Sequence, residues 1–143
     1  MVDDNDVNLL VAGSMLEDLG LEVISASSGY AALELLAPEK SADDTATRFD
    51  LVLMDRHMPE MDGLDATRAI RSGASAHSDV CIIALTASSL SSDQEECAAA
   101  GMNDFLAKPL TFESLIAMLE RWWPAITERA EARVAADVGK KAA

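Results

Sequence analysis

Residues 49–55, FDLVLMD, form a near-continuous apolar run of strand length that ends in a single acid, Asp55. A strand that is buried on both faces has this pattern, which is typical of parallel sheets covered by helices on both sides. Residues 80–87, VCIIALTA, repeat the pattern, with Thr86 near the end of the run. These two stretches predict a parallel α/β sheet.

Helical and strand patterns alternate along the rest of the chain, with helix-ending glycines at Gly20 and Gly101. This alternation predicts a doubly wound sheet with right-handed crossovers. Each unit should start with a strand, so we expect a first strand that ends at Asp3 and is truncated to Met1 and Val2. The expected helices are 5–19, 30–37, 64–73, 92–102 and 111–123, and the expected strands are 21–26, 49–55, 80–87 and 104–109.

Length and charge limit the classes of protein. With 143 residues the chain suits one domain, which we place at 1–123, followed by a helical extension or linker stub at 124–143. The formal net charge of −14 argues against a nucleic acid or an anionic membrane as partner. No apolar run reaches the roughly 18–20 residues of a membrane span. Cys81 and Cys97 lack metal-type spacing, which indicates reduced thiols in a cytoplasmic protein.

The ends of the expected strands carry a coherent set of polar groups. In a parallel α/β sheet the ligand site lies beyond the carboxyl ends of the strands. Three carboxylates there would suit Mg²⁺, while a lysine and a threonine hydroxyl would suit phosphoryl oxygens. An aspartate is a known nucleophile for phosphoryl groups, and Asp55 is the natural candidate. The set is Asp3 and Asp4 after the truncated strand, then Asp55, Thr86 and Lys108, with the backbone carbonyl of His57 as a further metal ligand.

Four motifs in order give a family resemblance over about residues 2–122. They are VDDND, DLVLMDRHMPEMDG, ALTA and LAKPL. With them the chain resembles the response-regulator receiver domains of two-component systems, most closely those of hybrid sensor histidine kinases. The resemblance implies a flavodoxin-like fold with strand order 2-1-3-4-5. It also implies a signalling module, not a turnover enzyme.

The resemblance also assigns roles to single residues. It implies Mg²⁺-dependent transfer of a phosphoryl group to Asp55 from a phosphohistidine on a histidine kinase or a histidine phosphotransfer protein. Lys108 would pair with the acceptor or the phosphoryl group, and Thr86 would close on the phosphoryl oxygen. Phe105 would be the switch aromatic that turns inward as Thr86 moves. The bond between Lys108 and Pro109 is cis in the family.

Two other readings stay open on the sequence. A haloacid-dehalogenase-like phosphatase also uses Mg²⁺, a nucleophilic aspartate, a threonine and a lysine, but its motif needs an acid two residues after the nucleophile, where this chain has His57. A degenerate receiver would act only as an interaction module, which the truncated first strand favours. Backbone groups left without partners cost about 1–3 kcal/mol each. We therefore expect a chain that is less stable than a full receiver, or a homodimer.

Overall fold

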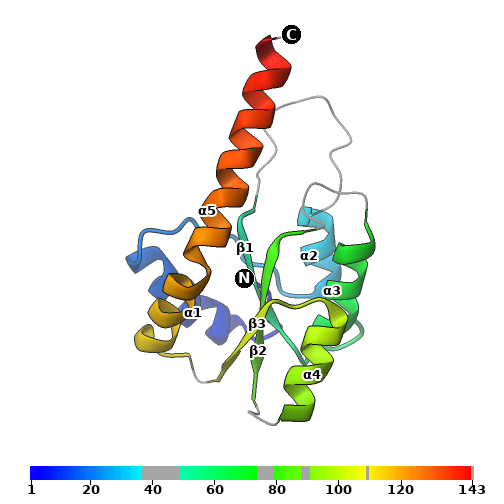
Figure 1. The fold of residues 1–143 in the computed structure, drawn as a ribbon. Helices are drawn as coiled ribbons and strands as arrows, with labels where there is room; N and C mark the ends of the chain where they lie inside the picture. Colours follow the sequence, from blue (N-terminus) through cyan, green and yellow to red (C-terminus); the bar gives the residue numbers. More distant parts are fainter. Residues whose placement is uncertain (37–48, 74–78, 88–90, 109, 143) are drawn as a thin grey trace. The chain divides into compact units, whose positions relative to one another are not determined.

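The computed structural model describes residues 1–36, 49–73, 79–87, 91–108 and 110–142, without the side chains of 91 and 129–142. The chain divides into two compact units, Met1–Leu110 and Thr111–Ala143. The first unit contains a sheet and the helices α1 (Asp6–Asp18), α2 (Gly29–Leu36), α3 (Gly63–Ser72) and α4 (Ser91–Ala100), and the second contains α5 (Phe112–Ala142) (Figure 1).

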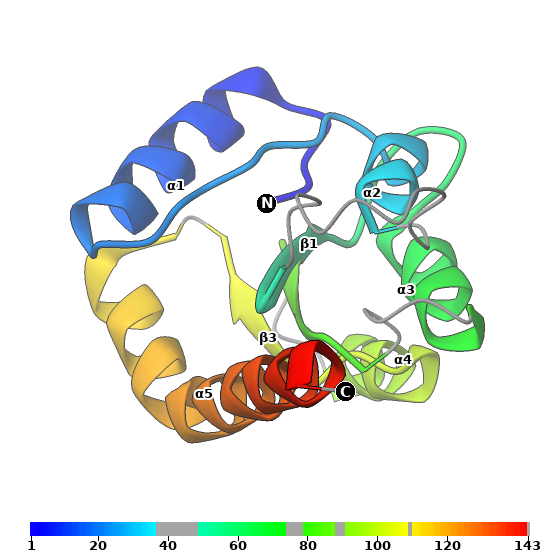
Figure 2. The same ribbon diagram turned by 90° about the horizontal axis from the view of Figure 1, so that it is seen from above.

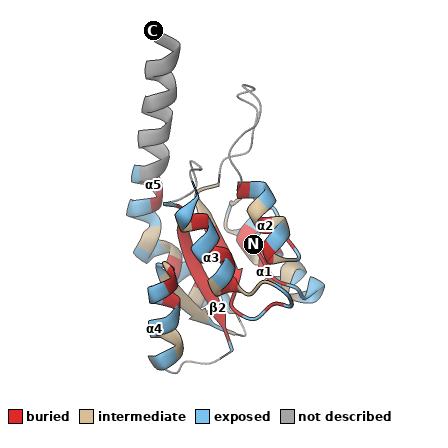
Figure 3. Ribbon diagram, turned by 90° about the vertical axis from the view of Figure 1, so that its right-hand side faces the viewer, coloured by how far each residue is buried: buried red, intermediate tan, exposed pale blue. Residues whose placement is uncertain are grey.

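The centre of the first unit is a parallel sheet in the order β1-β2-β3. Its strands are β1 (Leu51–Asp55), β2 (Cys81–Thr86) and β3 (Asp104–Ala107). Every residue of β2 is buried, as its unbroken apolar run requires, and Figure 3 shows this strand buried along its length. The strands predicted at 49–55, 80–87 and 104–109 are therefore confirmed, with shorter bounds.

The first three residues extend this sheet beyond β1. Val2 forms parallel bridges to both Ala26 and Met54. The amide of Asp55 donates to the carbonyl of Val2 at 2.8 Å, and the amide of Asp3 donates to the carbonyl of Ala26 at 3.1 Å. Across the sheet the order is thus the segment around Ala26, then Val2, then β1, β2 and β3. This confirms the 2-1-3-4-5 order, with Met1–Asp3 in the place of the first strand.

One predicted strand is wrong in extent. Residues 21–26 include the β-branched Val23 and Ile24, but among them only Ala26 takes part in a bridge. A strand is defined by the neighbour that shares its hydrogen bonds. Met1–Asp3 are the residues beside this segment, and they offer bonds only to Ile24 and Ala26. The ladder therefore stops after a single bridge.

The helices of the first unit flank the sheet, with α1 on one side and α2, α3 and α4 on the other (Figures 1 and 2). The side chain of Asn5 caps α1 by accepting from the amides of Val7 and Asn8. Ala12 and Leu16 of this helix are buried, while Val7, Leu10 and Val11 are exposed.

The second unit is the single helix α5, which has Pro124 in its interior. The helix predicted at 111–123 is confirmed. It continues across the domain boundary that we expect between 123 and 124, and that boundary stays a prediction. The side chain of Thr111 accepts from the amide of Ser114 at 3.1 Å, which satisfies a free donor of the first helical turn.

A small apolar cavity of about 30 Å³ lies beside Met1 and Val2. Ile24 lines it from one segment and Leu51 and Val52 line it from another, together with side chains of α2. The cavity therefore lies between two backbone segments that Met1–Asp3 join only at their ends.

A short run of β-branched apolar residues added before Met1 should raise the free energy of unfolding. Burying one such side chain stabilises by about 1.5–3 kcal/mol, and the added amides and carbonyls would pair across the cavity. We expect a gain of at least about 2 kcal/mol, measured by chemical denaturation. A Gly-Ser run of the same length is the control, and equal stability of the two versions would contradict the expectation. Size-exclusion chromatography of both versions tests the predicted homodimer.

Candidate functional site

The predicted site residues lie at the carboxyl ends of neighbouring strands because the backbone ladder aligns those ends. Asp55 is the last residue of β1, and Thr86 is the last residue of β2. Lys108 follows β3, and its amide donates to the carbonyl of Thr86 at 2.7 Å. Asp3 follows Val2, whose carbonyl accepts from the amide of Asp55. Four of the predicted residues are thus fixed by main-chain hydrogen bonds.

Three carboxylates meet at this edge. One ligand atom from each of Asp3, Asp4 and Asp55 lies within 4.8 Å of the others. Asp3 and Asp55 are buried, and Asp4 is exposed. Asp3 Oδ1 accepts from the amide of Asn5, but within the described residues Asp3 Oδ2 is buried and accepts no hydrogen bond. A buried carboxylate oxygen of this kind, beside two more carboxylates, fits a hard cation with oxygen ligands.

Lys108 brings a positive charge to the two buried acids. Its Nζ lies 3.0 Å from Asp55 Oδ1 and 3.3 Å from Asp3 Oδ2. Burial raises the pKa of Asp55, the bond from Lys108 lowers it in part, and the charge of Asp3 raises it further. Burial alone would lower the pKa of Lys108, but its contacts with Asp55 and Asp3 raise the pKa overall. The lysine is therefore an ammonium at neutral pH.

Thr86 and Phe105 lie on adjacent strands and on the same face of the sheet. Thr86 is in register with Ala107, and Phe105 is in register with Ala84. Residues two apart along a strand point to the same side, so the two side chains are diagonal neighbours. Thr86 is buried, and Phe105 is half-buried against the core of the first unit. The structure thus brings the two predicted switch residues together.

The remaining predicted residues have different outcomes. His57 is exposed, two residues after Asp55. Pro109 lies outside the described residues, so the predicted cis bond before it stays a prediction. The open side of the site adjoins α1, where a pocket is lined by Asp3 and Lys108 together with Asn8 and Val11.

Two residues at the site were missed by sequence reasoning. A Cβ on Gly63 would lie 2.3 Å from the carbonyl oxygen of Asp55, so only glycine allows the backbone of α3 to come this close. Arg56 is buried directly after Asp55 and pairs with Asp93 and Glu96 of α4. The Asp62-Gly63 pair was a turn signal that could have found the first residue. No sequence pattern pointed to the second.

Comparison with known proteins agrees with this arrangement. Residues 1–120 match the family model described as the response regulator receiver domain. The chain belongs to this family. The receiver spans only part of its curated relatives. It is 40% identical over 123 residues to the sensor protein GacS of Pseudomonas syringae pv. syringae, a match that covers 85% of this chain and 13% of the relative. It is 39% identical over 123 residues to the aerobic respiration control sensor protein ArcB of Escherichia coli, a match that covers 86% of this chain and 15% of the relative.

Solved receivers share the fold. The receiver domain of sensor histidine kinase PA1611 from Pseudomonas aeruginosa PAO1 has a TM-score of 0.71 and 41% identity, over 85% of this chain and 92% of that one. That structure holds a magnesium ion in its active-site cleft. The chemotaxis protein CheY4 of Vibrio cholerae has a TM-score of 0.72 and 29% identity, over 84% of this chain and 92% of that one. The flavodoxin-like prediction is therefore confirmed, as is the resemblance to receivers of sensor kinases.

Among the described residues, none of the helices is both long enough and apolar enough to cross a membrane.

Proposed function

We propose that this receiver accepts a phosphoryl group on Asp55 from a phosphohistidine, with Mg²⁺ bound by Asp3, Asp4 and Asp55. The observation that carries the proposal is the contact of one ammonium, Lys108 Nζ, with the two buried carboxylates of Asp55 and Asp3. Two observations support the metal: Asp3 Oδ2 is buried and accepts no hydrogen bond within the described residues, and the PA1611 receiver holds magnesium. The backbone carbonyl of His57 would be a further ligand.

The chemistry needs a nucleophile and positive charge around it. A carboxylate oxygen of Asp55 attacks the phosphorus, the bond from phosphorus to the donor imidazole nitrogen breaks, and the electron pair returns to that imidazole. Bound Mg²⁺ would offset the repulsion between the carboxylates and the incoming phosphoryl oxygens. Lys108, held 3.0 Å from Asp55, is close enough to exchange this contact for a phosphoryl oxygen.

The conformational switch would start at Thr86, the last residue of β2. In the proposed sequence of events, the hydroxyl of Thr86 bonds the phosphoryl oxygen and Phe105 turns inward into the space that opens. The shared face and diagonal placement of the two side chains support this coupling. Packed side chains of this kind change between discrete positions, because a dense interior does not deform continuously.

The phosphodonor would be a histidine kinase or a histidine phosphotransfer protein. The relatives that this chain matches include the sensor histidine kinase GacS and the sensor protein ArcB. A protein donor must cover the surface beside Asp55 to bring its histidine within bonding distance. The exposed apolar side chains Val7, Leu10 and Val11 on α1 offer such a surface, and Val11 lines the pocket that contains Asp3 and Lys108.

Three further features belong to this proposal. The receiver would catalyse only its own phosphorylation and dephosphorylation, and would not turn over an external substrate. It would act in the cytoplasm. Its domain would span residues 1–123, with 124–143 as a helical extension.

Mass spectrometry after incubation with acetyl phosphate and Mg²⁺ tests the proposal. We expect a single added phosphoryl group on the peptide that contains Asp55, and no addition when EDTA is present. Release of inorganic phosphate should stop once the acetyl phosphate is consumed. Sustained hydrolysis of simple phosphate esters would instead support the phosphatase reading. Intact, folded protein that takes up no phosphoryl group would support the degenerate receiver.

A further inference from the structure

Arg56 connects the strand that ends in Asp55 to α4. Its side chain is buried to about 90%, yet its guanidinium forms two ion pairs. One pair is with Asp93 in the first turn of α4, and the other is with Glu96, three residues further along the helix. The arginine therefore holds the amino-terminal half of α4.

The backbone of Arg56 is hydrogen-bonded to β2 and to the first residue of α3. Its amide donates to the carbonyl of Leu85, the residue before Thr86, at 3.0 Å. Its carbonyl accepts from the amide of Gly63, the first residue of α3, at 2.9 Å. Asp55 directly precedes Arg56 in the chain, and Thr86 directly follows Leu85, which bonds the Arg56 amide. A change at either residue is therefore close to the arginine that holds α4.

The two ion pairs differ in how far they are shielded from water, and therefore in strength. The side chain of Arg56 is 10% exposed, that of Asp93 is 21% exposed, and that of Glu96 is 57% exposed. A pair that is shielded from water is screened less than a surface pair, so Asp93 is the stronger partner. The pKa of Arg56 is raised, first of all by its hydrogen bond to Asp93. Loss of Asp93 would leave the buried guanidinium with only the solvated carboxylate of Glu96.

We propose that Arg56, Asp93 and Glu96 form a latch that holds α4 in the unphosphorylated position and opposes the phosphorylated conformation. This inference rests on the proposed function. Thr86 follows Leu85, whose carbonyl accepts from the amide of Arg56, so a movement of Thr86 toward a phosphoryl group on Asp55 acts on the residue that holds α4. The latch fixes the first turn of α4 against that movement. Arg56 is in this sense a positioning residue.

The coupling is reciprocal. If the phosphorylated state weakens the latch, then loss of the latch must favour the phosphorylated state by the same free energy. Beryllofluoride with Mg²⁺ mimics the phosphoryl group without being consumed, so its affinity measures this effect. Arg56→Met removes the charge and both pairs while keeping an apolar stem. Asp93→Asn keeps the arginine and removes the stronger pair.

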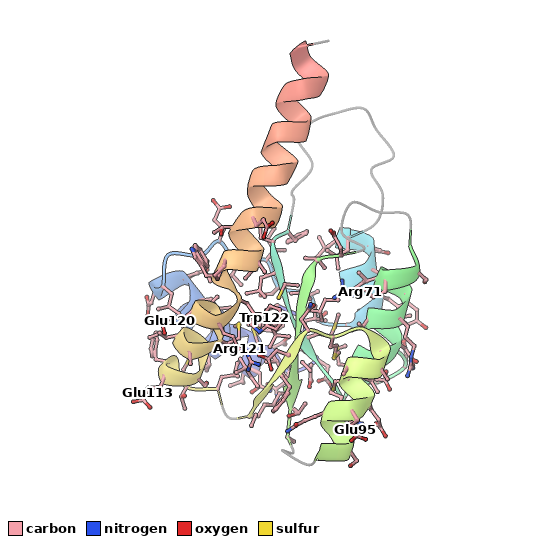
Figure 4. The ribbon with its side chains drawn as sticks, viewed as in Figure 1. Arg71, Glu95, Glu113, Glu120, Arg121 and Trp122 are labelled. Atoms are coloured by element: carbon pink, nitrogen blue, oxygen red, sulfur yellow. The ribbon has the colours of Figure 1, made fainter. Side chains whose placement is uncertain are left out.

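The experiment compares beryllofluoride affinity in the full chain with Mg²⁺. We expect the Kd to fall at least about threefold in Arg56→Met and Asp93→Asn, and by less in Glu96→Gln. Glu95→Gln is the matched control on the same helix, because Glu95 is exposed and projects from α4 (Figure 4). Its Kd should equal that of the wild type.

A second control separates the latch from simple loss of structure. Arg71 is an arginine of α3 that donates to the carbonyls of Gly101 and Val80 and to the side chain of Asn103 (Figure 4). These partners precede β2 and β3, at the edge of the sheet opposite Asp55. Arg71→Met should lower the melting temperature and leave the beryllofluoride Kd unchanged.

The outcomes distinguish the latch from the proposed function. An unchanged or higher Kd in both Arg56→Met and Asp93→Asn, with binding intact in the wild type, would overturn the latch alone. The same decrease in Kd in Arg71→Met would also overturn it, because any loss of stability would then have the effect. A folded wild type that binds no beryllofluoride would overturn the proposed function. Hydrogen exchange then still tests the contact itself, since amides of α4 should exchange faster in both latch variants.

Discussion

Asp55→Asn should abolish phosphoryl uptake from acetyl phosphate in the presence of Mg²⁺. The side chain of Asp55 ends β1 with its Oδ1 only 3.0 Å from Lys108 Nζ, and the asparagine amide keeps the shape but is no nucleophile. Removal of a nucleophile has lowered rates by up to about 10⁶-fold in a well-studied hydrolase, so a loss of at least about 100-fold is a conservative expectation. Intact-mass spectrometry at several times measures the rate.

Asp18→Asn is the matched control for this substitution. Asp18 is an exposed aspartate in the last turn of α1, and its replacement changes the net charge by the same amount. The control should take up the phosphoryl group at the wild-type rate. Phosphoryl uptake that survives in Asp55→Asn would show that another side chain is the acceptor. Thermal melts of the variants establish that both are folded.

The central sheet and the site could be predicted because they depend on the same local pattern. β1 and β2 are unbroken apolar runs that each end in one functional side chain, and parallel strands bring such ends together. Asp55, Thr86 and Lys108 were therefore found from the sequence pattern, whereas the order of their strands came from the resemblance to receiver domains. The packing of Phe105 on the face shared with Thr86 follows from its position two residues before Ala107.

Features that depend on a partner far along the chain could not be predicted. The segment 21–26 has strand composition, but its hydrogen bonds depend on which residues lie beside it. Val7 and Val11 have helical spacing, yet their exposure depends on the angle at which α1 packs. Arg56 directly follows an apolar run and Asp55, a position that a solvent-exposed arginine could equally occupy. Only the approach of Asp93, 37 residues later, turns it into a buried pair.

Mg²⁺ should stabilise the folded receiver, and Asp3→Asn should remove most of that gain. Asp3 is fully buried, and its Oδ2 accepts no hydrogen bond within the described residues. At a Mg²⁺ concentration one hundred times the Kd, binding to the folded state alone adds about 2.7 kcal/mol to the free energy of unfolding. The asparagine keeps the acceptor for the Asn5 amide but lacks the anionic oxygen, so we expect less than half of the wild-type gain.

The pH dependence without metal provides an independent check on the same carboxylates. Burial, and then the charge of Asp3, raise the pKa of Asp55, so the folded chain holds this proton more tightly than the unfolded chain. The contribution of Asp55 is therefore most favourable below its unfolded pKa and is lost as the pH rises through the folded value. Above the unfolded pKa, burial of this carboxyl therefore destabilises the fold in EDTA, and bound Mg²⁺ would offset that cost.

Asp3→Asn removes the repulsion between the two buried carboxylates, so in EDTA this variant should be at least as stable as the wild type at neutral pH. The melting temperature of wild type, Asp3→Asn and Asp18→Asn, each with Mg²⁺ and with EDTA, measures both effects. Wild type and Asp18→Asn should show the same metal-dependent increase. An equal increase in Asp3→Asn would mean that the cation binds elsewhere, because this buried oxygen could then not be one of its ligands.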